Sequence, residues 1–443
     1  MAVFSSVSTT WDPFSPDDET TAKALRTMTL TLMFSRFIIG IQYFVVMGFG
    51  WSISKKKVVI PLAIHGTVML LSSAVYLGLY YTFGPGQSGK SYIAWYVMAF
   101  FEVVAVIGTS SFYRIVSFKK THLVERMGLL TLIIFGEGII VMLKGINTVV
   151  KSFGWSKTMV GVIVSALFIV VSTLAYNDYF YWMFYFDYNP RNVHYGSIRQ
   201  QVWSLLHFPF HLSVVLSVEG LRQLLTFYNL NQTIMQISAD LVEVRDQPVK
   251  EAKILLSFFS FFYKDGNAKS VVKDYYDITS TIKEFSTYSI DDPAYTDTWN
   301  DLVYRLYIGL TEYYGIKVAY PKPGAAPISE AGEFMRILGV FDLAYKYFFI
   351  SVGVVFAMYG VFAIIVRRHM DIFDYISISL RFIIAGIFIG MLALPTNDIA
   401  YKAYIVSPWV IPQVCLMIFT VLVVDKTMSY FALRRAKFRL VEN

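Results

Sequence analysis

Nine apolar stretches, each long enough to cross a bilayer, constrain the fold of this chain more than any other feature. A helix needs about 20 apolar residues to span a hydrocarbon core of roughly 30 Å. Only 16% of the residues are charged, whereas a soluble protein carries about 25%. The sequence therefore predicts an all-α, polytopic transmembrane helix bundle. The expected spans are residues 27–53, 58–82, 91–117, 127–146, 159–186, 200–226, 337–366, 372–394 and 406–425.

One long connection interrupts this series of short loops. Residues 229–335 hold 15 acidic and 10 basic residues, and helical patterning occurs in 239–263 and 295–316. This connection is long enough to form an extramembrane, outer-side subdomain. The predicted organisation is a polar N-terminal segment (1–26), six spans (27–226), the subdomain (227–336), three spans (337–425) and a basic cytosolic tail (426–443).

The distribution of Lys and Arg predicts the orientation, because these residues accumulate on the cytosolic side of membrane proteins. The short loops and the tail on one side hold 15 of them, and the loops on the other side hold five. This places the N-terminus outside or in a lumen and the C-terminus in the cytosol. Asn231, in an Asn-Gln-Thr sequon on the predicted outer side, is a glycosylation candidate.

The expected partner is the lipid bilayer. The basic residues that give the chain a net charge of +7 lie mostly at membrane flanks, so the charge fits the topology and does not indicate nucleic acid. A protein partner at the 227–336 loop and a homo-oligomer are further hypotheses. Residues 1–26 contain no basic stretch before an apolar core, so no cleavable signal peptide is expected.

Ionisable residues within the apolar spans are the candidate functional residues. A charge inside a bilayer is costly unless it is paired, protonated or in contact with water. We interpret seven of these residues as candidates for a proton or ion path, and two arginines as their charge partners. The path candidates are Glu137, Glu219, His207, His211, Glu102, Asp178 and His65, and the charge partners are Arg36 and Arg381.

The span at 200–226 is the richest in such residues. His207 and His211 are four residues apart and share a helix face, and Glu219 lies about 12 Å further along the axis. Pro209 frees the carbonyl of Leu205, so a kink is expected there. Three interpretations stay open: a structural polar cluster, a proton or ion path, and a metal or haem site. No second helix rich in histidine is present, so neither a metal nor another cofactor is predicted.

Glu137 lies between Gly136 and Gly138. Two neighbours without side chains allow another helix to approach closely or water to reach the carboxylate. The alternatives are a structural ion pair with Arg36 or Arg381, and a site of protonation or ion binding.

Two short motifs suggest an internal repeat. SRFIIGI at 35–41 resembles SLRFIIAGI at 379–387, and the helix after each contains Val-Ile-Pro, at 59–61 and 410–412. In the predicted topology the two helices run in opposite directions, as in transporters built from inverted repeats.

These features favour a proton-linked transporter or a proton/ion-conducting protein. The alternatives are a non-catalytic membrane scaffold or assembly factor, and a haem- or metal-binding membrane enzyme. The chain contains no Walker A loop, no HExxH and no GxSxG nucleophile elbow, so we do not expect an enzyme.

Three sequence motifs carry a family resemblance. They are HLVERMGLLTLIIFGEGII at 122–140, the His-x-Pro helix from His207 to Gly220, and Leu-Met-x-Ser-Arg at 32–36. In order and spacing they resemble the low temperature requirement A (LtrA) family of polytopic membrane proteins. The Tyr-rich outer loop resembles that of fungal-type members. Members usually open with Glu-Leu-Phe-Phe-Asp-Leu, which residues 1–26 lack.

Overall fold

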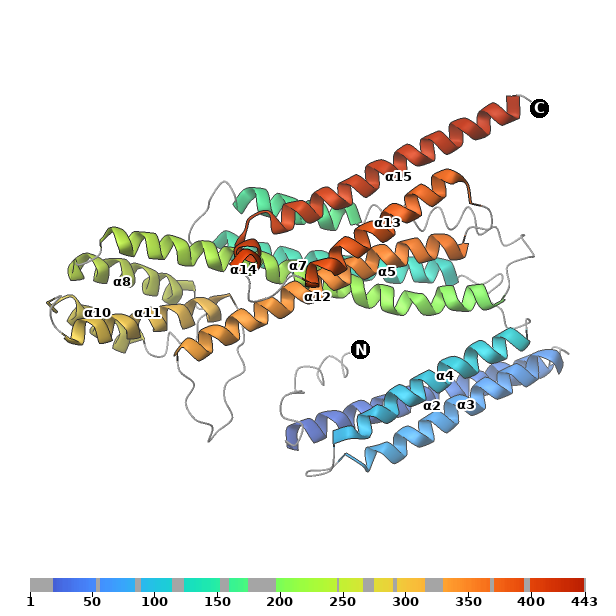
Figure 1. The fold of residues 1–443 in the computed structure, drawn as a ribbon. Helices are drawn as coiled ribbons and strands as arrows, with labels where there is room; N and C mark the ends of the chain where they lie inside the picture. The colour runs from blue at the N-terminus through green and yellow to red at the C-terminus, as the bar shows by residue number, and fades with distance from the viewer. Residues whose placement is uncertain are drawn as a thin grey trace. The chain divides into compact units, whose positions relative to one another are not determined.

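Every secondary-structure element that the structure describes is a helix (Figure 1). This computed structural model describes residues 19–52, 56–83, 89–113, 123–151, 159–173, 197–244, 247–265, 275–289, 293–314, 330–366, 370–393 and 399–441. The chain divides into two units. Unit 1 comprises Met1–Leu123 and Pro190–Leu205, and unit 2 comprises Val124–Asn189 and Leu206–Asn443.

Seven of the described helices are long and apolar enough to cross a membrane. They are α2 (Glu19–Ser52), α3 (Lys56–Tyr80), α5 (Leu123–Lys151), α7 (Ser197–Glu243), α12 (Glu330–Val366), α13 (Ile372–Gly390) and α15 (Val410–Val441). Shorter apolar helices occur at Ile93–Thr109, within α4 (Ile93–Phe112), and at Met159–Thr173. Each of the nine expected spans thus coincides with an apolar helix, which confirms the all-α polytopic bundle. Residues 174–186, the end of the fifth expected span, lie outside the described residues.

In unit 1, glycines allow α2 and α3 to pack closely. A Cβ atom on Gly40 would lie 2.8 Å from Leu70 Cδ2, and one on Gly66 would lie 2.9 Å from Phe44 Cε2. Both distances are shorter than a van der Waals contact, so only glycine fits at these positions without a shift of the neighbour. Such close contacts at small residues are the usual way in which helices associate within a bilayer.

In unit 2, α7 packs against α5 on one side and against α12 on another. Gly138 of α5 lies against Val218, where a Cβ atom would be 3.1 Å from Val218 Cγ1. Gly220 of α7 lies against Phe348 of α12, where a Cβ atom would be only 2.7 Å from Phe348 Cβ.

Helix α7 is too long to be a transmembrane span alone. Its 47 residues correspond to about 70 Å of helix, more than twice the thickness of a hydrocarbon core. Its C-terminal part therefore continues beyond the bilayer. The expected boundary at residue 227 does not coincide with a helix end, because the polar residues after 226 are compatible with helix and nothing before Glu243 stops it.

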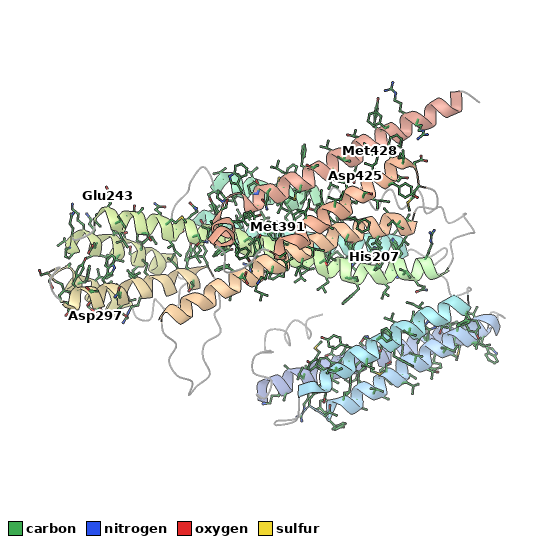
Figure 2. All side chains as sticks on the ribbon, in the orientation of Figure 1. His207, Glu243, Asp297, Met391, Asp425 and Met428 are labelled. Carbon is green, nitrogen blue, oxygen red and sulfur yellow. The ribbon has the colours of Figure 1, made fainter. Side chains whose placement is uncertain are left out.

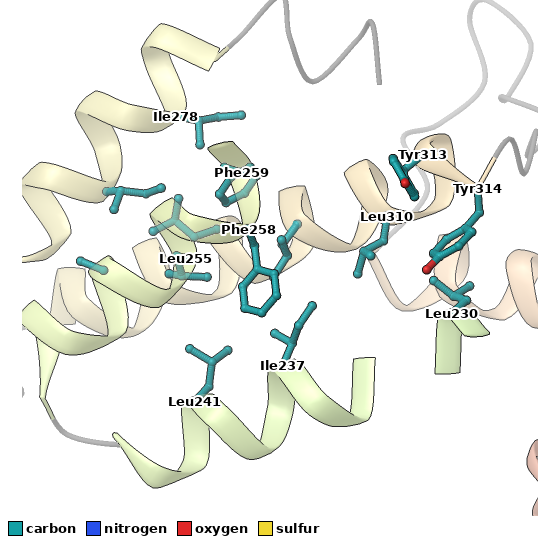
Figure 3. Packing of buried hydrophobic residues seen from close by; sticks show 14 of the residues in the cluster. Leu230, Ile237, Leu241, Leu255, Phe258, Phe259, Ile278, Leu310, Tyr313 and Tyr314 are labelled. Atoms are coloured by element: carbon teal, nitrogen blue, oxygen red, sulfur yellow. The ribbon is translucent and has the colours of Figure 1, made fainter. Parts of the chain in front are cut away.

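The C-terminal part of α7 packs with three further helices into the extramembrane subdomain (Figure 3). These helices are α8 (Pro248–Asp265), α10 (Tyr275–Phe285) and α11 (Pro293–Tyr313). Leu255, Phe259, Phe285 and Leu302 are completely buried in its core. The helical patterning predicted at 295–316 coincides with α11, whereas that predicted at 239–263 is divided between the end of α7 and α8. Pro248 occupies the first position of α8, where a missing backbone N–H has no cost.

Candidate functional site

The two histidines of α7 are adjacent and buried in unit 2. His207 is 2% exposed and His211 is 9% exposed, and their ring centroids are 5.5 Å apart (Figure 2 labels His207). The four-residue spacing places both rings on one face of the helix. The structure therefore brings together the two residues that the sequence paired.

His211 is joined to α5 by a short hydrogen bond. Its Nε2 lies 2.6 Å from Thr131 Oγ1, and the same hydroxyl is 2.8 Å from the Met127 carbonyl oxygen. A hydroxyl has only one proton to donate. If Thr131 donates that proton to Met127, then Nε2 of His211 must carry the proton of the second bond.

Aromatic side chains of α12 form the opposite wall of the histidine pair. The ring of Phe362 is 4.7 Å from that of His207, and Phe210 packs between the pair and Tyr359 at 5.3 Å. These neighbours pack aromatic rings against the histidine pair. Within the described ranges, no group of three His, Cys, Asp or Glu side chains is placed to hold a metal ion.

Two serine hydroxyl groups lie further along α7, beyond the histidines. Ser213 Oγ donates to the Pro209 carbonyl at 2.8 Å. Pro209 lies inside α7, between the two histidines in the sequence. Ser217 Oγ lies 2.7 Å from the Ser213 carbonyl and 3.1 Å from Ser351 Oγ of α12. The Ser217–Ser351 hydrogen bond links α7 to α12 within the span.

Glu219 forms an ion pair on its own helix. Arg222 Nε donates to its carboxylate at 3.0 Å, and Gln223 Nε2 donates at 3.0 Å. The Arg222 side chain lies against Gly145 of α5, where a Cβ atom would be 2.8 Å from Arg222 Cγ. Our sequence reasoning missed Arg222, although the three-residue spacing of an acid and a base is a recognisable helical pair.

Glu137 lies on an exposed face of α5. Within the part of the chain that the structure describes, it takes part in none of the ion pairs. Gly138 makes the close helix contact that the two glycines predicted, but with Val218 rather than at the carboxylate. Arg36 and Arg381, the expected charge partners, each have another carboxylate within their own unit.

In unit 1, Arg36 of α2 pairs with Glu102 of α4, with Nη2 and Oε2 3.1 Å apart. In unit 2, Arg381 of α13 pairs with Asp425 of α15 at 2.8 Å, and Ser377 donates a further hydrogen bond to Asp425. Asp425 was missed by our sequence reasoning. The sequence could have identified it, because Asp425 is the only acidic residue of the ninth expected span and a buried arginine requires a counter-charge.

The remaining sequence candidates lie apart from the histidine pair along the chain. His65 Nδ1 is 2.7 Å from the Pro61 carbonyl oxygen, and its ring stacks on Tyr43. Asp178 lies outside the described residues. Asn231 is inside α7 and donates to the Phe227 carbonyl at 3.0 Å, so the sequon is part of a helix rather than a loop.

Asp342 of α12 contacts a lysine and a tyrosine. Lys346 Nζ donates to Asp342 Oδ2 at 2.7 Å, across the four-residue spacing that places two side chains on one helix face. Tyr401, on the short helix α14 (Ile399–Val406), donates to the other carboxylate oxygen at 2.6 Å. Burial, together with this hydrogen bond and charge, raises the pKa of Tyr401 well above its usual value. The phenol therefore remains a proton donor at physiological pH.

Comparison with known proteins identifies the family. A profile described as bacterial low temperature requirement A protein (LtrA) matches residues 11–242, just over half of the 443 residues. No curated protein and no solved structure matches the chain. The matched segment contains α2 to α5 and the histidine pair of α7. With its apolar helices of membrane length, the chain is an integral membrane protein that belongs to the LtrA family.

Proposed function

We propose that this protein is a proton-linked transporter or a proton/ion-conducting protein. The observation that carries the proposal is the buried pair of His207 and His211, joined to α5 through Thr131. Histidine is the side chain whose charge changes near neutral pH. A pair of imidazoles in a membrane-spanning helix is therefore suited to accept and release protons during turnover.

The polar residues along α7 support this function. From His207 to Glu219 the helix carries the histidines, two serines and a carboxylate over about 18 Å of its length. That length exceeds half of a hydrocarbon core of roughly 30 Å. Proton relays in membranes use such series of ionisable and hydroxyl side chains.

Several further expectations belong to this proposal. The N-terminus faces the outside or a lumen and the C-terminus faces the cytosol, as the Lys and Arg distribution favours. The protein transports rather than catalyses, and it works as a homo-oligomer. The Tyr-rich insertion supports its placement with fungal-type members of the family.

The test is pH-dependent flux in proteoliposomes, read with a pH-sensitive dye after an imposed pH jump. We expect flux with the wild type and its loss with His211→Ala, because alanine removes the titratable ring. Thr131→Val is the matched control for the hydrogen bond, since it breaks the same contact and leaves the imidazole in place. Folded wild-type protein that conducts neither protons nor other ions at any pH would reject the proposal.

A second candidate is a membrane scaffold or assembly factor. The observation that favours it is the pairing of carboxylates with arginines at Arg36–Glu102 and Arg381–Asp425, which is typical of structural contacts between helices. In that case the extramembrane subdomain recruits a protein partner. A partner retained by the full chain and lost after substitutions on the exposed surface of the subdomain would favour this function.

A further inference from the structure

An apolar cavity lies inside unit 2, between α5, the helix Met159–Thr173, α7, α12 and α15. Its volume is about 50 Å³, and it is a recess that opens to the surface of the unit rather than a sealed void. Side chains such as Phe135, Val214 and Ile418 form its walls. None of the carboxylates or histidines described above lines it.

The hydroxyl groups of Ser217 and Thr173, which line the cavity, already have partners. Ser217 Oγ is bonded to the Ser213 carbonyl and to Ser351 Oγ, and Thr173 Oγ1 donates to the Ile169 carbonyl at 2.6 Å. A water molecule in a cavity needs two to four polar partners, and apolar cavities that lack them stay dry. A ligand that fits this lining is therefore apolar and needs no hydrogen bond.

We propose that this cavity binds the end of a lipid acyl chain. The helices that form it are apolar enough to span a membrane, and the medium around such helices is hydrocarbon. An engineered cavity of about 150 Å³ binds a whole benzene molecule. A recess one third as large accepts the last few carbons of a chain whose remainder stays outside.

The position of the cavity gives the bound chain a structural role. Val352 and Val355 of α12 face it from one side and Val218 of α7 from another. An acyl chain in this recess fills the space between α7 and α12 next to the Ser217–Ser351 contact and keeps water away from it. This inference does not depend on the proposed transport function.

Photolabelling tests the site. The full chain is reconstituted in nanodiscs that contain phosphatidylcholine with a diazirine near the terminal methyl group of one acyl chain. A parallel sample receives palmitic acid with the same diazirine. We expect saturable labelling at Val352 and Val355, which are buried and out of reach from the lipid face of the helix. Labelling by the first probe identifies a bilayer lipid as the source of the chain, and labelling by the second alone identifies a free fatty acid.

Adjacent valines of α7 provide matched variants. Val214 lines the cavity and is 2% exposed, whereas Val215 is 49% exposed. Val214→Phe fills the recess and should reduce the labelling of α12 at least tenfold, while Val215→Phe should leave it unchanged. If Val214→Phe does not fold, Ile418→Phe fills the recess from α15.

Three results would overturn the proposal. They are no label at the buried valines from either probe, equal labelling in the filled and control variants, and labelling of the wild type that excess unlabelled lipid does not reduce. The last of these needs no variant.

Discussion

Among single residues, the buried Arg381–Asp425 pair gives the sharpest stability prediction. Both side chains are 5% exposed, so Asp425→Asn leaves a buried arginine without its counter-charge. Breaking a buried pair in this way costs about 3–5 kcal/mol. The control is Asp301→Asn, which breaks an exposed pair with Arg305 and should cost no more than about 1 kcal/mol. Denaturant unfolding in the same detergent compares them, and equal losses would contradict the role of burial.

Glu137 should behave differently from Asp425. It is exposed and takes part in none of the described ion pairs, so Glu137→Gln should not lower the free energy of unfolding, because it removes a charge from a membrane span without leaving a partner unpaired. Gln keeps the shape and hydrogen bonding of Glu but cannot titrate. If Glu137 takes part in proton transfer, the variant therefore folds normally and loses pH-dependent flux. An unfolding loss as large as that of Asp425→Asn would instead show a structural pair.

At this scale the sequence indicated which residues form polar contacts inside the spans, but it did not indicate most of the residues that they contact. The four-residue spacing of His207 and His211 sufficed to place them together, because helical geometry alone fixes such a contact. The pairs Arg36–Glu102 and Arg381–Asp425 join different helices. Their formation depends on how the helices pack, which the spacing along the chain does not encode.

At the scale of helices, small residues determine how closely α7 and α12 approach. Gly220→Ala places a Cβ atom 2.7 Å from Phe348 Cβ, an atom that cannot move without its backbone. The helices must separate, at a cost of about 1–3 kcal/mol. Gly136→Ala meets no atom within 4 Å, and alanine there should stabilise the helix by roughly 0.5–1 kcal/mol. Thermal unfolding of both variants measures the difference, and two shifts of the same sign would contradict this packing.

The core of the extramembrane subdomain offers a second matched pair. Leu255 of α8 is completely buried, whereas its neighbour Leu256 is 36% exposed. Leu255→Ala should destabilise the subdomain by about 2–5 kcal/mol because it leaves a cavity, and Leu256→Ala should cost much less. Limited proteolysis within 227–336 reports the loss directly. Similar cleavage rates for the two variants would place the core elsewhere.

The sequence predicted the helices better than it predicted where they end. Apolar stretches of about 20 residues identify spans because the thickness of a bilayer requires them. Where α7 leaves the membrane, however, the composition becomes polar while the helix continues to Glu243. A change of surroundings alters which residues are favoured without altering backbone hydrogen bonding, so the predicted boundary at 227 marked a change of environment rather than a helix end.

At the scale of the whole molecule, α7 and α12 connect the membrane spans of unit 2 to the extramembrane subdomain. Phe227 of α7 stacks on Phe341 of α12 at 4.1 Å, and Asn229 donates to Tyr314, which directly follows α11, at 2.7 Å. Buried aromatic and polar contacts thus join the membrane spans of unit 2 to the subdomain. Helix α7 is continuous from the histidine pair to the subdomain, so both belong to one structural element.

The orientation of the whole chain is testable with single cysteines. Cys415 is the one native cysteine, so a Cys415→Ser background carries only the introduced thiol. Cysteine at Ser286, in the subdomain, and at Ser88 should react with an impermeant maleimide from outside. Cysteine at Ser54 and Thr121, which with Ser88 lie outside the described residues, should react only after the membrane is permeabilised. The reason is the concentration of Lys and Arg in the loops that contain these two positions. Labelling with the opposite sidedness would reverse the topology and place the subdomain in the cytosol.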